Sequence, residues 1–190
     1  MDTSIGALMG LLRETLADPR ATARRLISLQ LPIEARWMAF ALATLASVIV
    51  LQGLGMVATG STEMPSPMLF VLLLASANLV GVVAIHQVGR LMGGLGSFED
   101  TLLLVAWLQS IQVMLILLQS IAFLVLPPLG GIVQIVGLVV LLWLLTSFVA
   151  ELHGFRSLWA VFGMIVVVSL GLSFVLLAVL AGLGLAPTGD

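Results

Sequence analysis

Five apolar runs, each long enough to cross the hydrocarbon core of a bilayer, occupy most of this chain. A membrane-spanning helix needs about 20 consecutive apolar residues. The runs cover about residues 38–59, 68–88, 101–126, 129–150 and 160–185. The chain is 61% hydrophobic and 8% charged, whereas a soluble domain is about 45–50% apolar and about a quarter charged. The sequence therefore predicts an all-α integral membrane protein with five transmembrane helices.

The basic residues predict the orientation of these helices. All seven lie on the same side of the membrane once the five runs are threaded through it. They are Arg13, Arg20, Arg24, Arg25, Arg36, Arg90 and Arg156. Because cytoplasmic loops are enriched in basic residues, we expect the N-terminus in the cytoplasm and the C-terminus in the periplasm. Residues 1–36 are then a cytoplasmic segment, 37–186 the membrane domain and 187–190 a periplasmic tail.

Two short amphipathic helices are expected before the first span. In the first, Ile5, Leu8, Met9, Leu12 and Leu16 recur at the spacing of one helix face. The residues Asp18 and Pro19 then suit the N-cap and the first position of a second helix.

The second short helix carries three arginines, Arg20, Arg24 and Arg25. A basic amphipathic helix is attracted to an anionic leaflet, by about 1 kcal/mol for each arginine near the surface. These side chains are therefore candidate contacts to anionic lipid. The alternative is that the helix packs against the cytoplasmic loops of the protein itself, and the sequence does not decide between the two.

The remaining charges gather at the two turns that face the cytoplasm in this topology. This inner-face charge cluster consists of Arg90, Glu99, Asp100, Glu151, His153 and Arg156. Ion pairs within the cluster would lock the two turns together, and the same charges would otherwise receive a soluble partner or a lipid headgroup. Ser97, three residues before Asp100, predicts a capping box at the start of the third span, and Ser157 is a candidate N-cap for the fifth.

Neutral amides are the polar groups predicted to lie within the spans. They include Asn78, Gln109, Gln112 and Gln119. Amides inside membrane helices are mostly used for hydrogen bonds between helices, each worth about 0.6–2 kcal/mol. The alternative is that they line a polar path for a small solute. No ionisable group is predicted at mid-membrane, and the deepest is His86, which argues against a proton-coupled pump.

Little in the sequence supports catalysis or a cofactor. The chain has no cysteine and two histidines, so a metal site or a nucleophilic triad has few residues to draw on. Neither a GxSxG elbow, nor an HExxH zinc pair, nor a glycine-rich nucleotide loop occurs. We predict no metal, no cofactor and no enzymatic activity.

Three stretches carry a family resemblance. They are DPRATARRL before the first span, HQVGRLMGGLGSFEDTLLLVAW at the first inner turn and FVAELHGFRSLWAVF at the second. Together they resemble the bacterial branch of the Ypt-interacting protein (YIP) family. The resemblance implies a cytoplasmic N-terminal segment followed by five spans, and a binding role instead of catalysis. The acidic and aromatic cytoplasmic signature of the eukaryotic members is missing, so the resemblance does not extend to their Rab-type GTPases.

These observations lead to one main hypothesis and one alternative. The main hypothesis is a non-catalytic protein of the bacterial inner membrane that binds lipid, docks onto a larger membrane assembly, or does both. Its expected partners are membrane lipids, anionic on the cytoplasmic leaflet, and a membrane protein complex or a second copy of the chain, with no nucleic acid. The alternative is a small-solute transporter or channel that uses the span amides.

Overall fold

The computed structural model describes residues 5–59 and 66–182, and these residues form helices and connecting turns. The helices are α1 (Ile5–Ala17), α2 (Pro19–Ser28), α3 (Ile33–Thr59), α4 (Pro67–Leu91), α5 (Phe98–Val125), α6 (Pro127–His153) and α7 (Leu158–Gly182). Within α3 to α7, five helical stretches are long and apolar enough to cross a membrane. The predicted all-α, five-span fold is therefore confirmed. The predicted periplasmic tail, 187–190, lies outside the described residues.

The helices extend beyond the predicted spans at the end of the bundle where α4 and α6 finish and α5 and α7 begin. We call this the inner end. Helix α4 continues to Leu91, α5 begins at Phe98 and α6 continues to His153. The sequence had placed the inner-face charges in the turns between the spans. Most of them instead lie on the ends of helices. An apolar run marks only the hydrophobic part of a helix. The polar turn at its end is also helical, because the backbone hydrogen bonds of the helix continue through it.

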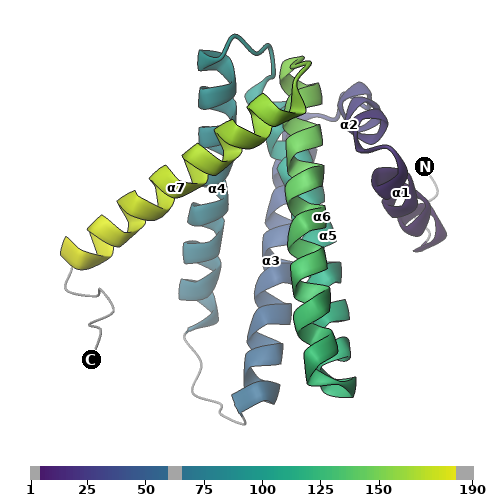
Figure 1. Cartoon of the computed structure of the whole chain (residues 1–190), viewed down its shortest axis with the longest axis vertical. Coiled ribbons are helices and arrows are strands. Elements are labelled where there is room, and N and C mark those ends of the chain that lie inside the picture. Colours follow the sequence, from purple (N-terminus) through teal and green to yellow (C-terminus); the bar gives the residue numbers. More distant parts are fainter. Residues whose placement is uncertain (1–4, 60–65, 183–190) are drawn as a thin grey trace.

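Figure 1 shows the arrangement of the helices. Helices α3, α4, α5 and α6 run up and down, and α7 leaves the inner end obliquely on one side. On the other side of the bundle, α1 and α2 lie near the inner end, where α2 contacts both α5 and α6. The N-terminal segment is therefore part of the packed fold.

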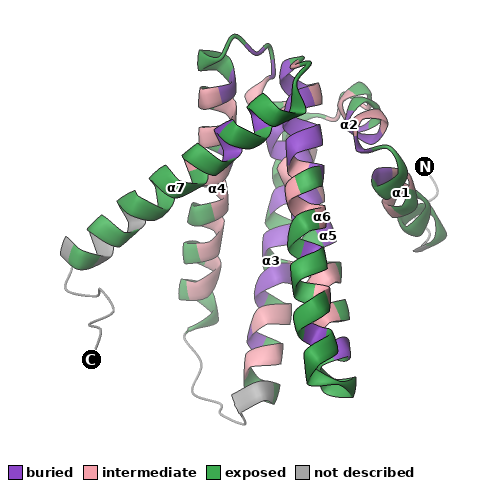
Figure 2. Cartoon of the chain, in the orientation of Figure 1, coloured by how far each residue is buried: buried purple, intermediate pink, exposed green. Residues whose placement is uncertain are grey.

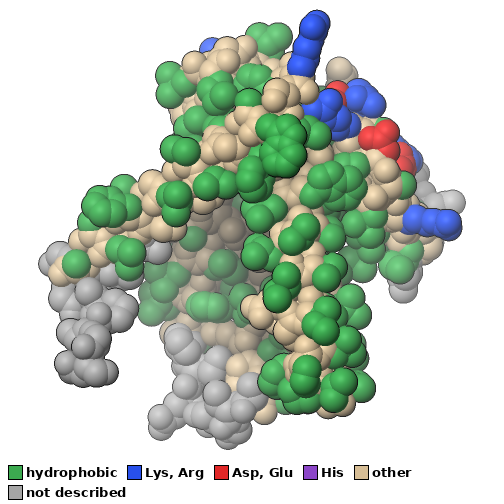
Figure 3. Space-filling model, in the orientation of Figure 1, with side chains coloured by type: hydrophobic (Ala, Val, Ile, Leu, Met, Phe, Trp, Pro, Cys, Tyr) green, Lys and Arg blue, Asp and Glu red, His purple; other side chains and the backbone are tan. Residues whose placement is uncertain are grey.

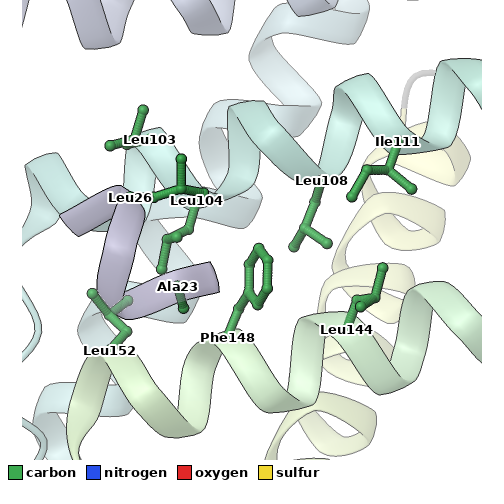
Figure 4. Close-up of a cluster of buried hydrophobic side chains, with 9 residues drawn as sticks. All are labelled: Ala23, Leu26, Leu103, Leu104, Leu108, Ile111, Leu144, Phe148 and Leu152. Atoms are coloured by element: carbon green, nitrogen blue, oxygen red, sulfur yellow. The ribbon is translucent and has the colours of Figure 1, made fainter. Parts of the chain in front are cut away.

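The buried core is concentrated at the inner end. Its largest cluster joins α2, α5 and α6 around Phe148 (Figure 4). Two smaller clusters join α6 to α7 around Val161 and α3 to α4 and α5 around Val82. Away from this end, most side chains of α4 and α7 are exposed, as the green ribbons of Figure 2 show. In a membrane these exposed apolar faces meet lipid, so the inner end is the part of the molecule whose geometry the packing fixes.

The local signals for helix ends are confirmed. The Asp18 carboxylate accepts a hydrogen bond from the amide of Ala21, at 2.9 Å, and the Ser97 hydroxyl oxygen accepts one from the amide of Asp100, at 3.0 Å. Ser157 accepts from the amide of Ala160 at 3.3 Å. Each cap satisfies an amide that has no partner inside its helix. These bonds reach only three residues along the chain, which is why the sequence predicts them well.

A side-chain hydrogen bond joins helix α1 to α5. The indole Nε1 of Trp107 donates to the hydroxyl oxygen of Thr15 at 3.1 Å. Thr15 is buried, and Leu11 and Leu12 pack partly against the main core. The face predicted from Leu8, Met9, Leu12 and Leu16 is therefore only partly used, since Leu8, Met9 and Leu16 remain exposed.

Replacing Thr15 by valine removes this acceptor while keeping the shape of the side chain. We expect Thr15→Val to loosen α1 by about 1–3 kcal/mol, because the indole N–H loses its partner in a partly buried place. Hydrogen exchange of the α1 amides in detergent would report the change, with faster exchange in α1 and unchanged exchange in α6. Thr44→Val, whose hydroxyl bonds within the bundle, is the matched control. Equal exchange in α1 for both variants would contradict the anchoring role.

Candidate functional site

The two inner turns meet at His153, the last residue of α6. The amide of Leu95 donates to the backbone carbonyl of His153 at 3.4 Å, and the amide of Gly96 donates to its Nδ1 at 3.3 Å. Because Nδ1 accepts a hydrogen bond, the neutral ring carries its proton on Nε2. The side chain is 2% exposed. His153 is thus a buried connector between the turns and not an accessible member of the predicted charge cluster.

Three glycines make room for this imidazole. A Cβ at Gly89 would overlap the ring, and one at Gly94 would lie 2.5 Å from the Cβ and Nδ1 of His153. A Cβ at Gly96 would lie 2.7 Å from Leu152 and 2.9 Å from the ring. Separations under 3.0 Å are hardly ever seen for real Cβ atoms. The glycines therefore bring the end of α4 and the α4–α5 turn into direct contact with α6.

The second histidine, His86, lies one turn before Arg90 on α4 and packs edge-on against Phe98, with ring centroids 5.9 Å apart. The ring of His153 stacks on that of Phe155, with ring centroids 5.6 Å apart, a separation typical of paired aromatic rings. Nδ1 of His86 and Nε2 of His153 are both enclosed without a hydrogen-bond partner. The Ser97 hydroxyl donates to Asp100 at 2.6 Å, so no serine–histidine pair forms among the described residues of this site.

An open cavity of about 450 Å³ lies beside this junction. Its lining consists of His86, Arg90, Gly94, Leu95, Gly96, Ser97, Phe98 and Glu99. We call it the inner-turn pocket. The volume lies within the range of about 300–1,000 Å³ that is typical of ligand sites. Charged side chains and a cavity coincide here, since Arg90 and Glu99 both belong to the lining.

The predicted charge cluster forms ion pairs, but with other partners than expected. Asp100 pairs with Arg36 of α3 at 2.6 Å, and Glu151 pairs with Arg24 of α2 at 3.0 Å. The sequence suggested pairs between the two inner turns, whereas the acids instead hold α3 and the N-terminal segment. The two acids thus pair with arginines of α2 and α3 and not with charges of the opposite inner turn.

Three other residues of the inner-face charge cluster form no ion pair within the described part of the chain. They are Arg90, Glu99 and Arg156, and all three are exposed. Arg90 and Glu99 line the same cavity without pairing. They are therefore available to a ligand with charges of both signs.

The arginines proposed as lipid contacts are engaged with the protein. Arg20 donates to the carbonyl of Phe155 at 3.3 Å, Arg24 pairs with Glu151, and Arg25 pairs with Glu14 of α1. Helix α2 buries Thr22, Ala23 and Leu26. The structure thus favours the alternative in which this helix packs on the protein itself. Most of the charged side chains visible in Figure 3 lie on the side of α1 and α2, beside a largely apolar surface.

Comparison with known proteins places the chain in a family. The model of the Yip1 domain matches residues 13–180, nearly the whole of the described chain. The chain belongs to the Yip1 domain family. This agrees with the resemblance carried by the inner turns and the DPRATARRL stretch. The Yip1 domain is found in multi-pass membrane proteins that are not known as enzymes. Neither the curated proteins nor the solved structures gave a match.

In this Yip1 domain the span amides do not share one surface. Gln109 is buried, and its side-chain oxygen accepts from the Thr44 hydroxyl of α3 at 3.4 Å. Gln112 is exposed, while Asn78 and Gln119 are half-buried. Gln109 therefore acts as a helix-to-helix contact, as the main interpretation of these amides expected. The arrangement gives no support to a polar path built from all four.

Sequence reasoning missed the glycines that cradle His153. Residues 93–96 were predicted only as a glycine-rich turn, and Gly89, one residue beyond the predicted span 68–88, had no predicted role. A usable signal was present, since each inner turn of this chain carries a histidine, then a glycine, then a phenylalanine: His86, Gly89 and Phe98 at the first, and His153, Gly154 and Phe155 at the second. The partner of the glycines was not predictable, because His153 lies more than 50 residues further along the chain.

Proposed function

We propose that this Yip1 domain protein is a non-catalytic organising protein of the bacterial inner membrane that binds lipid at its cytoplasmic side through α1. The observation that carries the proposal is the exposed apolar face of α1, formed by Leu8, Met9 and Leu16, on a helix that is fixed to the bundle. The accompanying role is docking onto a larger membrane assembly. In that role, α1 would contact the lipid at the edge of the assembly.

The depth of α1 supports lipid contact. Trp107, its anchor, is nine residues after the start of α5, which is about 13 Å along a helix at 1.5 Å per residue. Helix α5 has 28 residues, about 42 Å in length, and the hydrocarbon core is about 30 Å thick. With α5 upright and centred in the bilayer, the backbone of Trp107 lies about 7 Å inside the hydrocarbon boundary, and Thr15 bonds to its indole. Amphipathic helices bury their apolar faces to about this depth, 5–10 Å.

The charges of the N-terminal segment support the same placement. Arg25 pairs with Glu14 and Arg24 with Glu151, so two of the charges near α1 are neutralised within the protein. An isolated α1 would bind a membrane weakly and reversibly. Because α2 is packed into the main core, α1 is held in place, and its contact with lipid needs no further ordering of the chain.

The absence of cysteine in the sequence allows a direct test with single-cysteine variants. We expect an environment-sensitive fluorophore at Met9→Cys or Leu16→Cys, in protein reconstituted in nanodiscs, to report an apolar surrounding. The same fluorophore at Arg156→Cys, an exposed position of the second inner turn away from α1, is the control and should report water. A lipid-soluble quencher should act on the first two sites and spare the third.

Equal, water-like emission from all three sites would contradict lipid contact by α1. The organising role has a separate test, which is extraction in mild detergent followed by analysis of bound lipid and protein. Wild-type protein that is always recovered alone, as a monomer and free of phospholipid, would count against that role. The triple variant Leu8→Gln, Met9→Gln, Leu16→Gln should retain less phospholipid than wild type.

A further inference from the structure

The inner-turn pocket is a second place where the observations point to a ligand. It lies on α4 and the start of α5, away from α1, and combines a basic and an acidic side chain that do not pair. We propose that this pocket binds the headgroup of a zwitterionic phospholipid with a primary ammonium group, as in phosphatidylethanolamine. The inference goes beyond the proposed lipid contact of α1, because it concerns other residues and a specific headgroup.

The positive side of the pocket suits a phosphodiester. Arg90 lines the cavity and is exposed, and no ion pair of the described chain occupies its guanidinium. The arginine fork binds phosphate oxygens well. The first amides of α5, at Phe98 and Glu99, have no partner inside the helix and lie at the same edge. Helix N-termini favour negative groups.

The negative side of the pocket distinguishes headgroups. Glu99 lines the same cavity and also lacks an ion pair among the described residues. A purely anionic ligand would bring its charge close to this carboxylate without compensation. A phosphodiester that carries an ammonium group matches both Arg90 and Glu99. A primary ammonium also donates hydrogen bonds to a carboxylate, whereas a choline group cannot.

The surroundings favour a lipid over a soluble phosphate ester. Leu95, which lines the pocket, is 92% exposed, and Leu91, at the end of α4, is 85% exposed. Most of α4 beyond this end is also exposed and apolar. Side chains of this kind at a water–lipid boundary contact acyl chains. A lipid seated in the pocket would therefore place its headgroup between Arg90 and Glu99 and its chains beside α4.

The shape of the pocket is held without a ligand. The Leu95 and Gly96 amides are bonded to His153, and Gly94 donates to the Gly89 carbonyl at 2.9 Å. The glycine cradle therefore fixes the turn that forms one wall. A preformed wall lowers the cost of ordering on binding.

Native mass spectrometry of the delipidated full chain, titrated with single lipids, tests the proposal. We expect phosphatidylethanolamine to bind about tenfold more tightly than phosphatidylcholine or phosphatidylglycerol of the same chains, the size of one hydrogen bond to a charged group. Arg90→Gln should weaken phosphatidylethanolamine binding about tenfold. Glu99→Gln should remove the preference over phosphatidylcholine. Both residues are exposed, so neither change is expected to disturb folding.

Arg156→Gln, which removes an exposed arginine at the other inner turn, is the matched control and should leave binding unchanged. Equal affinity for the three lipids, or an equal effect of Arg90→Gln and Arg156→Gln, would overturn the proposal. Competition by free phosphoethanolamine at the same concentration as the lipid would also overturn it, in favour of a soluble ligand. The α1 variants should keep the lipid preference, so failure here and failure of the lipid contact of α1 are distinguishable.

Discussion

Gly89→Ala is expected to destabilise the protein by about 2 kcal/mol, within the range of about 1–3 kcal/mol for overpacking a well-packed site. The new methyl group would overlap the imidazole of His153. That ring has no space to withdraw, because it is stacked on Phe155 and bonded to the Gly96 amide. Denaturation in mixed detergent and SDS micelles, followed by circular dichroism, would measure the loss.

Gly81→Ala in the same helix is the matched control. A Cβ at position 81 would meet no atom within 4 Å, so this change should be neutral or slightly stabilising, since alanine is the better helix former. Substitution of two glycines eight residues apart on α4 should therefore destabilise the protein at position 89 and not at position 81. Equal stability of the two variants would show that the contact between Gly89 and His153 is not tight.

A second substitution separates a steric clash from any other effect at position 89. His153→Ala removes the ring that the new methyl group would strike. The double variant Gly89→Ala, His153→Ala should lose less stability than the sum of the two single changes, by about 1 kcal/mol or more, as is usual for residues in contact. Strict additivity would place the cause outside this pair.

Arg36→Met is expected to have the second large effect, a loss of about 3 kcal/mol, because it leaves a largely buried carboxylate without its cation. The side chain of Arg36 is 10% exposed and that of Asp100 is 21% exposed. Arg36 also donates from Nε to the carbonyl of Leu31 at 2.8 Å. Its loss would therefore remove contacts from the start of α3 both to the Leu31 carbonyl and to Asp100 of α5. The measurement is again unfolding in mixed micelles.

Two controls accompany this prediction. Arg24→Met breaks the pair with Glu151, in which the arginine side chain is 58% exposed, and it should cost at most about 1 kcal/mol, as exposed pairs do. The double variant Arg36→Met, Asp100→Asn removes both charges and should recover most of the stability. Similar losses for Arg36→Met and Arg24→Met would contradict the buried character of the first pair.

The sequence predicts well those features that depend on neighbours along the chain. The five spans follow from runs of apolar residues, and the caps at Asp18 and Ser97 follow from a bond that reaches three residues. The amphipathic pattern of α1 was also predictable. Its stripe did not distinguish Leu12, which packs on the bundle, from Leu8 and Met9, which are exposed, and it left out Leu11, which also packs on the bundle.

The candidate site depended on contacts that no local pattern specifies. The charged residues were correctly identified as a group near one end of the helices, but the partners of Asp100 and Glu151 were not. Arg36 reaches Asp100 because α3 and α5 are neighbours, and Arg24 reaches Glu151 because α2 lies on α6. These neighbours are selected by side-chain packing between helices, which the sequence of a single helix does not specify.

By itself, then, the sequence determined the number of helices and the concentration of charged residues at their inner ends. Hydrophobic length and capping act within one helix, so both can be predicted from local sequence. The direction of the helices relative to the membrane stays a prediction from the arginines. Only the tertiary structure decided that His153 is enclosed by three glycines, that α2 belongs to the core, and that Arg90 and Glu99 remain free around a pocket. The physical reason is that close packing between two helices depends on the complementary shapes of both side-chain surfaces. Those surfaces come from distant parts of the chain, so neither local sequence specifies the contact.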